Sequence, residues 1–205
     1  MGRLVFRSSQ LVWEAVTLGA IVLSVAVNVG LTAKARRLEN AIDRLKGENR
    51  LNVGQQVPAL EGIDLDGKHV SITFDGSTPQ PTLFYVLSPS CGWCYRNTEN
   101  YKTIVKKLAS THRIVVVSLT SEGLADYARS ESYAGTVISG VSDAARKAYH
   151  FSGTPQTIEV DNTGKVVHAW TGAYEGSIGA EVTKAYQVAL PGLRPPRRVE
   201  TAGAN

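Results

Sequence analysis

Cysteine is scarce in this chain of 205 residues, which contains only Cys91 and Cys94, in the stretch SPSCGWCY. A structural zinc site needs four ligands, commonly two such pairs or one pair with a spaced histidine pair. The four histidines instead stand singly, at positions 69, 112, 150 and 168. A disulfide between the two cysteines would close a loop of only four residues, where stabilisation by chain entropy is smallest. The pattern disfavours a metal site and a purely structural crosslink, and it favours a redox-active pair.

The chain also has a low net charge, +4, and no recurring mixture of basic and aromatic residues through its middle. The basic residues gather near the N-terminus, at 34–37 and in the C-terminal RPPRR. Such clusters are typical of membrane flanks and solvated tails rather than of a nucleic-acid surface. We therefore expect no nucleic acid among the partners.

One region almost lacks charge, because residues 11–31 contain a single charged side chain, Glu14. About 20 apolar residues suffice to cross the hydrocarbon core of a membrane. We predict a transmembrane anchor over 11–32, after an N-terminal flank over 1–10. A cleavable signal peptide is the alternative, since the AKA sequence at 33–35 loosely resembles a small-residue cleavage site. A literal count of flanking basic residues would leave the rest of the chain in the cytoplasm, but that rule weakens for long translocated domains.

Residues 33–52 predict a juxtamembrane helix or linker. Apolar residues alternate at spacings of four and three, as in a helix seam, at Leu31, Ala35, Leu38, Ile42 and Leu45. The repeat ends after about two heptads. A monomeric spacer helix is the main interpretation, and a homodimer through this helix is the alternative.

From residue 53 the sequence changes to short apolar runs separated by turns. Asp66-Gly67 predicts a hairpin with apolar residues alternating on both arms, Ile63 and Leu65 on the first and Val70, Ile72 and Phe74 on the second. Further elements are predicted, in order, as a strand at 81–88, a helix from Cys91, a strand at 113–119, a helix capped by Ser121, a weaker strand and a short helix up to 151, strands at 156–160 and 165–171, and a helix at 174–190.

This alternation predicts an α/β domain over 53–190, with a central mixed sheet flanked by helices. The polar, proline-rich residues 191–205 predict a disordered tail.

The cysteine pair falls between a buried strand and the start of a helix, which places Cys91 about at the N-cap. Unpaired backbone N–H groups and the helix dipole favour a thiolate there, and only the thiolate attacks a disulfide. Cys94, one turn further on, can resolve a mixed disulfide from the more buried side. We predict Cys91 as the nucleophile and Cys94 as the resolving thiol. Trp93 is predicted to be an exposed apolar surface that grips a polypeptide, and packing of its ring against the domain is the alternative.

Three motifs carry a resemblance to the thioredoxin fold over about 53–190: GQQVPALEGIDLDGKHVSI, the strand–SPSCGWC–helix unit, and FSGTPQTIEVDNTGKVV. The extra N-terminal β-hairpin and the predicted anchor resemble the TlpA/ResA-like group of membrane-anchored thiol-disulfide oxidoreductases. The resemblance implies a cis peptide bond between Thr154 and Pro155, where the backbone receives a cysteine-containing chain. It further implies protein substrates, a redox partner protein, no cofactor beyond the Cys91–Cys94 disulfide, and a single-pass protein whose domain lies on the periplasmic side of the cell membrane.

Three positions depart from the family pattern. Ser90 stands where many members have tryptophan, and Trp93 where many have proline. Tyr85 occupies the position at which thioredoxins have a buried acid that relays protons. Glu159, on the strand after Pro155, is an alternative proton relay, since burial raises a carboxyl pKa into a useful range; a salt-bridged or edge-facing glutamate is the competing interpretation.

Two functions follow. The first is a membrane-tethered, extracytoplasmic thiol-disulfide oxidoreductase, and the lack of any spare cysteine fits an oxidising compartment. The second is a copper(I) chaperone or docking module, because soft thiolates suit Cu(I) and His150 lies close to the Thr-Pro loop in sequence. The physiological substrate and the redox direction do not follow from the sequence.

Overall fold

The structure is a computed structural model that describes residues 13, 18, 19, 21, 23–38, 51–76 and 78–197. It divides into two compact units, residues 1–50 and residues 51–205, so the folded domain begins two residues before the predicted boundary. In the first unit, residues 23–38 are helical, but the rest of the predicted anchor and linker lies largely outside the described residues. Within the described part of the chain, no helix is both long and apolar enough to cross a membrane.

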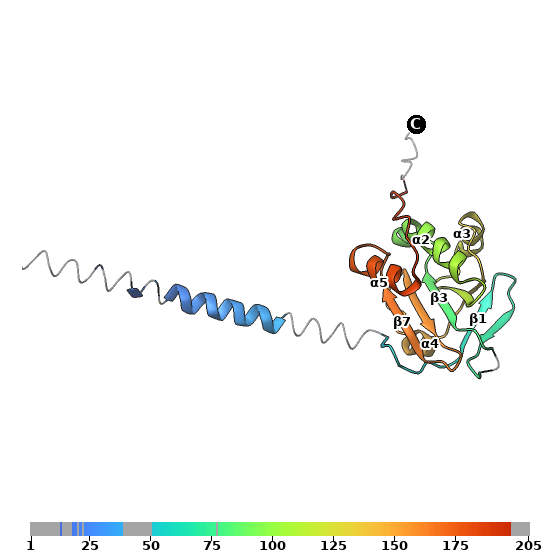
Figure 1. The fold of residues 1–205 in the computed structure, drawn as a ribbon, viewed down its shortest axis with the longest axis horizontal. Helices are drawn as coiled ribbons and strands as arrows, with labels where there is room; N and C mark the ends of the chain where they lie inside the picture. Colours follow the sequence, from blue (N-terminus) through green and yellow to red (C-terminus); the bar gives the residue numbers. More distant parts are fainter. Residues whose placement is uncertain are drawn as a thin grey trace, which may run out of the picture. The chain divides into compact units, whose positions relative to one another are not determined.

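The described residues of the second unit form a seven-stranded mixed sheet in the order β2-β1-β5-β4-β3-β6-β7 (Figure 1). Strands β3, β4 and β5 run parallel to one another. On one side β1 pairs antiparallel with β5 and β2 with β1, and on the other side β6 pairs antiparallel with β3 and β7 with β6. The strands are β1 (Leu60–Asp64), β2 (His69–Ile72), β3 (Thr82–Leu87), β4 (Arg113–Ser118), β5 (Thr136–Ser139), β6 (Gln156–Val160) and β7 (Val166–Thr171). The predicted α/β domain with a mixed sheet is therefore confirmed.

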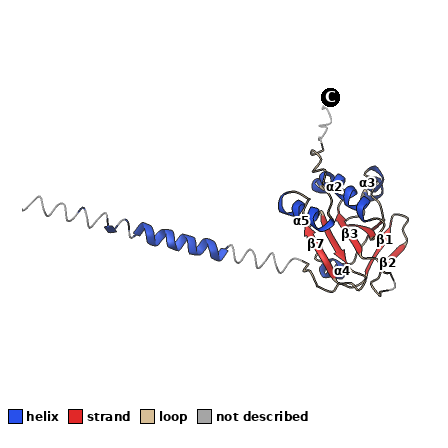
Figure 2. Cartoon of the chain, in the orientation of Figure 1, coloured by secondary structure: helices blue, strands red, loops and turns tan. Residues whose placement is uncertain are grey.

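Helices cover both faces of this sheet (Figure 2). One core joins alternate residues of β3 to the apolar sides of α2 (Gly92–Leu108), α3 (Leu124–Ser130) and α5 (Gly176–Tyr186). The other core joins the remaining residues of β3 to β1, β2 and α4 (Asp143–Ala148). Because every residue of β3 is buried, this strand is the centre of the domain, and its end carries the cysteine loop.

The extra hairpin is present, with Gly62 opposite Val70 in the antiparallel pair of β1 and β2. The predicted apolar alternation is confirmed on the second arm, where Ile72 is buried and Val70 and Phe74 pack against the core. It is wrong on the first arm, because Ile63 is 37% exposed and Leu65 43% exposed while Leu60 is fully buried. The reason is the close approach of β5, since a Cβ at Gly62 would lie 2.9 Å from the carbonyl oxygen of Ser139. Gly62 therefore faces inward, and Ile63, the next residue, faces outward.

Two helix boundaries also differ from prediction. The N-cap of α3 is Gly123, at φ +66°, without a side-chain capping bond, so the predicted cap at Ser121 is wrong. Ser121 contributes its carbonyl oxygen instead, which accepts the N–H of Leu124 at 3.2 Å. The last helix is shorter than the predicted 174–190, because Gln187 closes it at φ +50°.

The predicted disordered tail is wrong for residues 191–197, which pack against the domain. The N–H of Gly192 donates to Asn100 Oδ1 at 2.9 Å, and the N–H of Arg194 donates to the carbonyl oxygen of Arg96 at 2.8 Å. Arg194 and Arg197 form ion pairs with Glu99 and Glu131, which lie far from them in the sequence. Residues 198–205 lie outside the described residues.

Candidate active site

Cys91 is the N-cap of α2, as predicted, and it follows directly on the loop after β3. Its backbone is extended, with φ −77° and ψ 110°, and its Sγ accepts the N–H of Cys94 at 3.2 Å. The first turn of a helix has N–H groups without helical acceptors, so a sulfur at this position takes one of them. The loop itself is closed by the N–H of Cys91, which donates to the carbonyl oxygen of Ser88 at 3.0 Å.

The two cysteines are free thiols in opposite surroundings. Hydrogen bonding from the Cys94 thiol, helped by the Thr154 side chain and by the backbone N–H groups of Cys94 and Trp93, lowers the pKa of Cys91 to about 5 against the opposing effect of partial burial. Cys94 is fully buried, and burial raises the pKa of its thiol far above the ordinary range. One thiolate at neutral pH beside one protonated thiol is the charge state that nucleophilic attack followed by resolution requires.

The loop before β6 faces Cys91. The peptide bond between Thr154 and Pro155 is cis, as predicted. The carbonyl oxygen of Thr154 lies 3.4 Å from Cys91 Sγ, and it accepts the proton when Cys91 is in its thiol form. Two segments separated by 63 residues in sequence therefore meet at the nucleophilic sulfur.

Beside this loop lies an open groove of about 350 Å³. Its walls include Trp93, Thr154, Pro155 and Ile178, with Glu175 among its polar contributors. Trp93 is 46% exposed, as its predicted role in gripping a polypeptide would need. The groove is thus apolar next to the nucleophile and large enough for side chains of an extended peptide.

Ser90, the other unusual residue of the loop, lies at the surface rather than in the groove. Its Oγ lies 3.1 Å from Ser88 Oγ, which in turn lies 3.4 Å from Thr120 Oγ1. Ser88 therefore connects the cysteine loop to the residues just after β4, and Ser90 contributes a small hydroxyl where a tryptophan would add a bulky apolar surface.

Tyr85 replaces the buried acid of thioredoxins with a neutral group. Its hydroxyl accepts a hydrogen bond from Asn97 Nδ2 at 3.2 Å, and burial raises its pKa well above the ordinary value. Asn97 Oδ1 also accepts from Asn100 Nδ2 at 3.1 Å and from the N–H of Tyr174 at 3.0 Å. The interior behind Cys94 is therefore a satisfied, uncharged polar network.

Sequence reasoning missed this network, although the sequence contains a signal for it. Asn97 and Asn100 follow Cys94 at intervals of three, on the helix face that also buries Tyr101 and Ile104. Amides on an otherwise apolar face are seldom buried without partners. Their position indicates a polar network, although the spacing alone does not identify its other members.

The structure does not bring Glu159 to the cysteines. Its Oε2 accepts a hydrogen bond from the Tyr186 hydroxyl at 2.9 Å, and its Oε1 lies 3.4 Å from His112 Nε2. It pairs with Leu83 across the strands, four residues beyond Pro155, which corresponds to about 13 Å of strand. These contacts match the salt-bridged interpretation, and they give no support to Glu159 as a proton relay.

Histidines lie apart from the cysteine pair as well. His150 contributes its backbone carbonyl oxygen to Gln156 Nε2 at 3.4 Å. Among the residues the structure describes, no group of three or more histidine, cysteine, aspartate or glutamate side chains is placed to hold a metal ion. The copper(I) hypothesis would therefore depend on the two thiols themselves.

Comparison with known proteins identifies the fold but not a sequence family. No model of a known protein family matches the sequence, and no curated protein sequence is similar to it. Solved structures do match. A thiol:disulfide interchange protein from Bacteroides sp. is 25% identical, with a TM-score of 0.52, over 67% of this chain and 91% of the other.

Two further solved structures are similar to this chain. The thioredoxin domain of a thiol-disulfide oxidoreductase from Bacteroides vulgatus is 23% identical, with a TM-score of 0.52, over 66% of this chain and 99% of the other. StoA from Bacillus subtilis is 16% identical, with a TM-score of 0.50, over 65% and 99%. The domain therefore has the thioredoxin-like fold, and the resemblance of the sequence to thiol-disulfide oxidoreductases of this fold is confirmed.

Proposed function

We propose that this chain is a membrane-tethered thiol-disulfide oxidoreductase that acts on protein cysteines outside the cytoplasm. The observation that carries the proposal is the polarised pair, Cys91 with a pKa of about 5 and Cys94 buried one turn behind it. The names of the structural neighbours, which include thiol-disulfide oxidoreductases, support the same activity.

The reaction follows from the charge state of the pair. The Cys91 thiolate attacks a disulfide sulfur of the substrate, which forms a mixed disulfide and releases one substrate thiolate. Cys94 then attacks Cys91 Sγ, which forms the Cys91–Cys94 disulfide and releases the second substrate sulfur, while the Cys94 proton passes to a released substrate thiolate. Two electrons pass to the substrate, and the reverse sequence oxidises a substrate dithiol.

The groove favours an extended polypeptide as the substrate. Its apolar walls lie beside the cis Thr154–Pro155 bond, whose carbonyl oxygen is 3.4 Å from the nucleophile. A chain that lies against this loop presents its cysteine to Cys91, and its flanking side chains face Trp93 and Ile178. A redox partner protein would use the same surface to reset the pair.

The pKa of Cys91 also indicates the range in which the reduction potential of the Cys91–Cys94 pair should lie. A stabilised thiolate stabilises the reduced form, so lower pKa values accompany more oxidising pairs. The value of about 5 lies between about 7 for thioredoxin and about 3.5 for a strong periplasmic oxidant. We expect a potential between about −270 and about −120 mV.

The membrane tether and the compartment belong to the same proposal. They are supported by the nearly uncharged run at 11–31 and by the lack of any cysteine besides the active pair. In intact cells, a membrane-impermeant maleimide should label Cys91 if the domain lies outside the cytoplasm. Labelling only after lysis would contradict this location.

The activity is tested with a trap. Cys94→Ala lacks the resolving thiol, so incubation with oxidised insulin should accumulate an adduct that dithiothreitol releases, whereas Cys91→Ala should form none. Absence of a thiol-dependent adduct with Cys94→Ala would contradict the proposal. Stoichiometric copper in anaerobically purified protein, together with no insulin reduction, would favour the copper(I) alternative.

A further inference from the structure

The segment formed by residues 191–197, here called the C-terminal strap, is built into the domain beside the active-site helix. Its backbone bonds to Asn100 through Gly192 and to Arg96 through Arg194. Asn100 is fully buried, so its Oδ1 would lose its partner without the strap. The strap is therefore an integral part of the folded domain.

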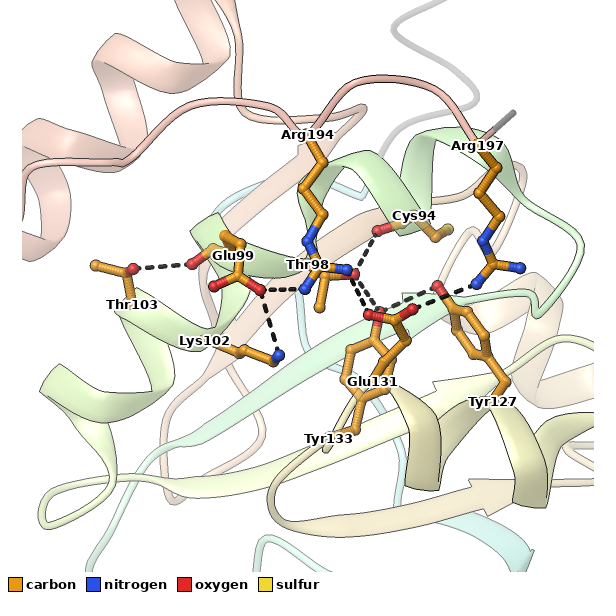
Figure 3. Close-up of polar contacts among 10 residues, drawn as sticks. All are labelled: Cys94, Thr98, Glu99, Lys102, Thr103, Tyr127, Glu131, Tyr133, Arg194 and Arg197. Atoms are coloured by element: carbon orange, nitrogen blue, oxygen red, sulfur yellow. Dashed lines mark hydrogen bonds and ion pairs between the residues drawn. The ribbon is translucent and has the colours of Figure 1, made fainter. Parts of the chain in front are cut away.

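Ion pairs also hold the strap against the domain (Figure 3). Arg194 binds Glu99 and, at 2.5 Å, Glu131, while Arg197 contacts Glu131 at 3.3 Å. Glu131 is 7% exposed, and its ion pairs among the described residues come from the strap. A buried carboxylate is costly without such partners, so it favours the docked position of the strap.

Arg96 connects the strap to the groove. Its Nε donates to the carbonyl oxygen of Arg194 at 3.0 Å, and its own carbonyl oxygen accepts the N–H of Arg194. Its guanidinium lies 4.4 Å from the centre of the Trp93 ring. The side chain of Arg96 therefore contacts both the C-terminal strap and Trp93, a wall of the groove.

We propose that the C-terminal strap and Arg96 position Trp93 as a wall of the substrate groove, so that the strap raises the affinity of the groove for polypeptide substrates. The inference rests on the proposed function. A half-exposed tryptophan would otherwise occupy several rotamers, and holding it in place removes an ordering cost from binding. Arginine suits the task, because its planar group stacks on the ring while Nε remains free to donate.

Cys91 chemistry should not depend on this assembly. The groups that lower the pKa of Cys91 are Cys94, Thr154 and the backbone N–H of Trp93, and none of them belongs to the strap. Arg96 and the strap are therefore positioning elements, which act on KM for polypeptides and not on attack at a small disulfide.

The test compares full-length protein with Arg96→Ala and with a chain that ends at Leu193, which keeps the Gly192–Asn100 bond. A chain that ends at Arg197 is the matched control, because it retains the whole strap. For reduction of insulin, we expect KM to rise about 3- to 10-fold in both test variants and to stay constant in the control. Turnover of hydroxyethyl disulfide and the pH midpoint of Cys91 alkylation should not change.

Coupling is the sharper measurement. If the strap acts through Arg96, the variant that combines Arg96→Ala with the end at Leu193 should have no higher KM than the more affected single variant. Multiplication of the two effects would overturn the inference.

A readout without turnover separates this inference from the proposed function. In protein labelled with 5-fluorotryptophan, the ¹⁹F resonance of Trp93, assigned with Trp93→Phe, should shift in Arg96→Ala and in the chain ending at Leu193. The resonance of Trp170, a buried core residue of β7, should stay in place. Normal exchange with an unshifted Trp93 resonance in the shortened chain would overturn the inference alone. Failure of the unaltered chain to exchange any disulfide would overturn the proposed function.

Discussion

The two sides of the central sheet bury different chemistry. The side covered by α2, α3 and α5 combines Cys94 with tyrosines and with the amides of Asn97 and Asn100. The side covered by α4 is filled mainly by aliphatic residues, with Phe84, Tyr149 and Phe151. Adjacent residues of β3 supply both sides, since Phe84 faces one core and Tyr85 the other. On the α4 side, stability comes mainly from the packing of apolar side chains. On the side of α2, α3 and α5, the core must also keep the Cys94 thiol in its neutral form.

The largest effect on stability is expected on the aliphatic side. Ile158→Ala removes a fully buried side chain and should lower the free energy of unfolding by about 2–5 kcal/mol, measured by urea titration. The midpoint of Cys91 alkylation should remain near pH 5, because Ile158 contributes nothing to that pKa. A shifted midpoint in the folded variant would mean that the two sides are not independent.

An intermediate effect is expected where the strap meets the site side. Glu131→Gln removes a nearly buried charge that pairs with Arg194 and Arg197, so the free energy of unfolding should fall by about 2 kcal/mol. Asp126→Asn is the matched control, since its pair with Arg129 is 86% and 75% exposed and should contribute less than about 0.5 kcal/mol. Equal losses would contradict docking of the strap on a buried carboxylate.

The smallest effect compares one hydroxyl from each side. Tyr85→Phe leaves the buried Asn97 Nδ2 without its acceptor and should cost about 1–2 kcal/mol. Tyr149→Phe removes a bond to the carbonyl oxygen of Pro58, an exposed residue that water can reach, and should cost less than about 1 kcal/mol. Chemical denaturation of both variants measures the difference, and a greater loss for Tyr149→Phe would reverse the comparison.

The sequence predicted the parts of the molecule that depend on local pattern. The apolar runs placed β3 and β4, and the position of the cysteines between strand and helix placed the N-cap. The cis bond before Pro155 was implied by the resemblance to the thioredoxin fold. Contacts between distant segments were not predictable in this way. The strap reads as a polar, proline-rich tail because its partners, Glu99 and Glu131, lie more than 60 residues away. Ile63 was placed inward because alternation does not reveal how closely β5 approaches Gly62.

The central claim, that one helical turn separates a stabilised thiolate from a protonated thiol, is tested most directly by alkylation. Reduced full-length protein is treated with iodoacetamide across pH 3–10, and each cysteine is quantified by mass spectrometry. Since the thiolate is the reactive form, labelling of Cys91 should increase with pH around a midpoint of about 5, while Cys94 stays unlabelled in the folded protein. Labelling of both cysteines with a common midpoint near that of a free thiol, about 8.5, would contradict the account.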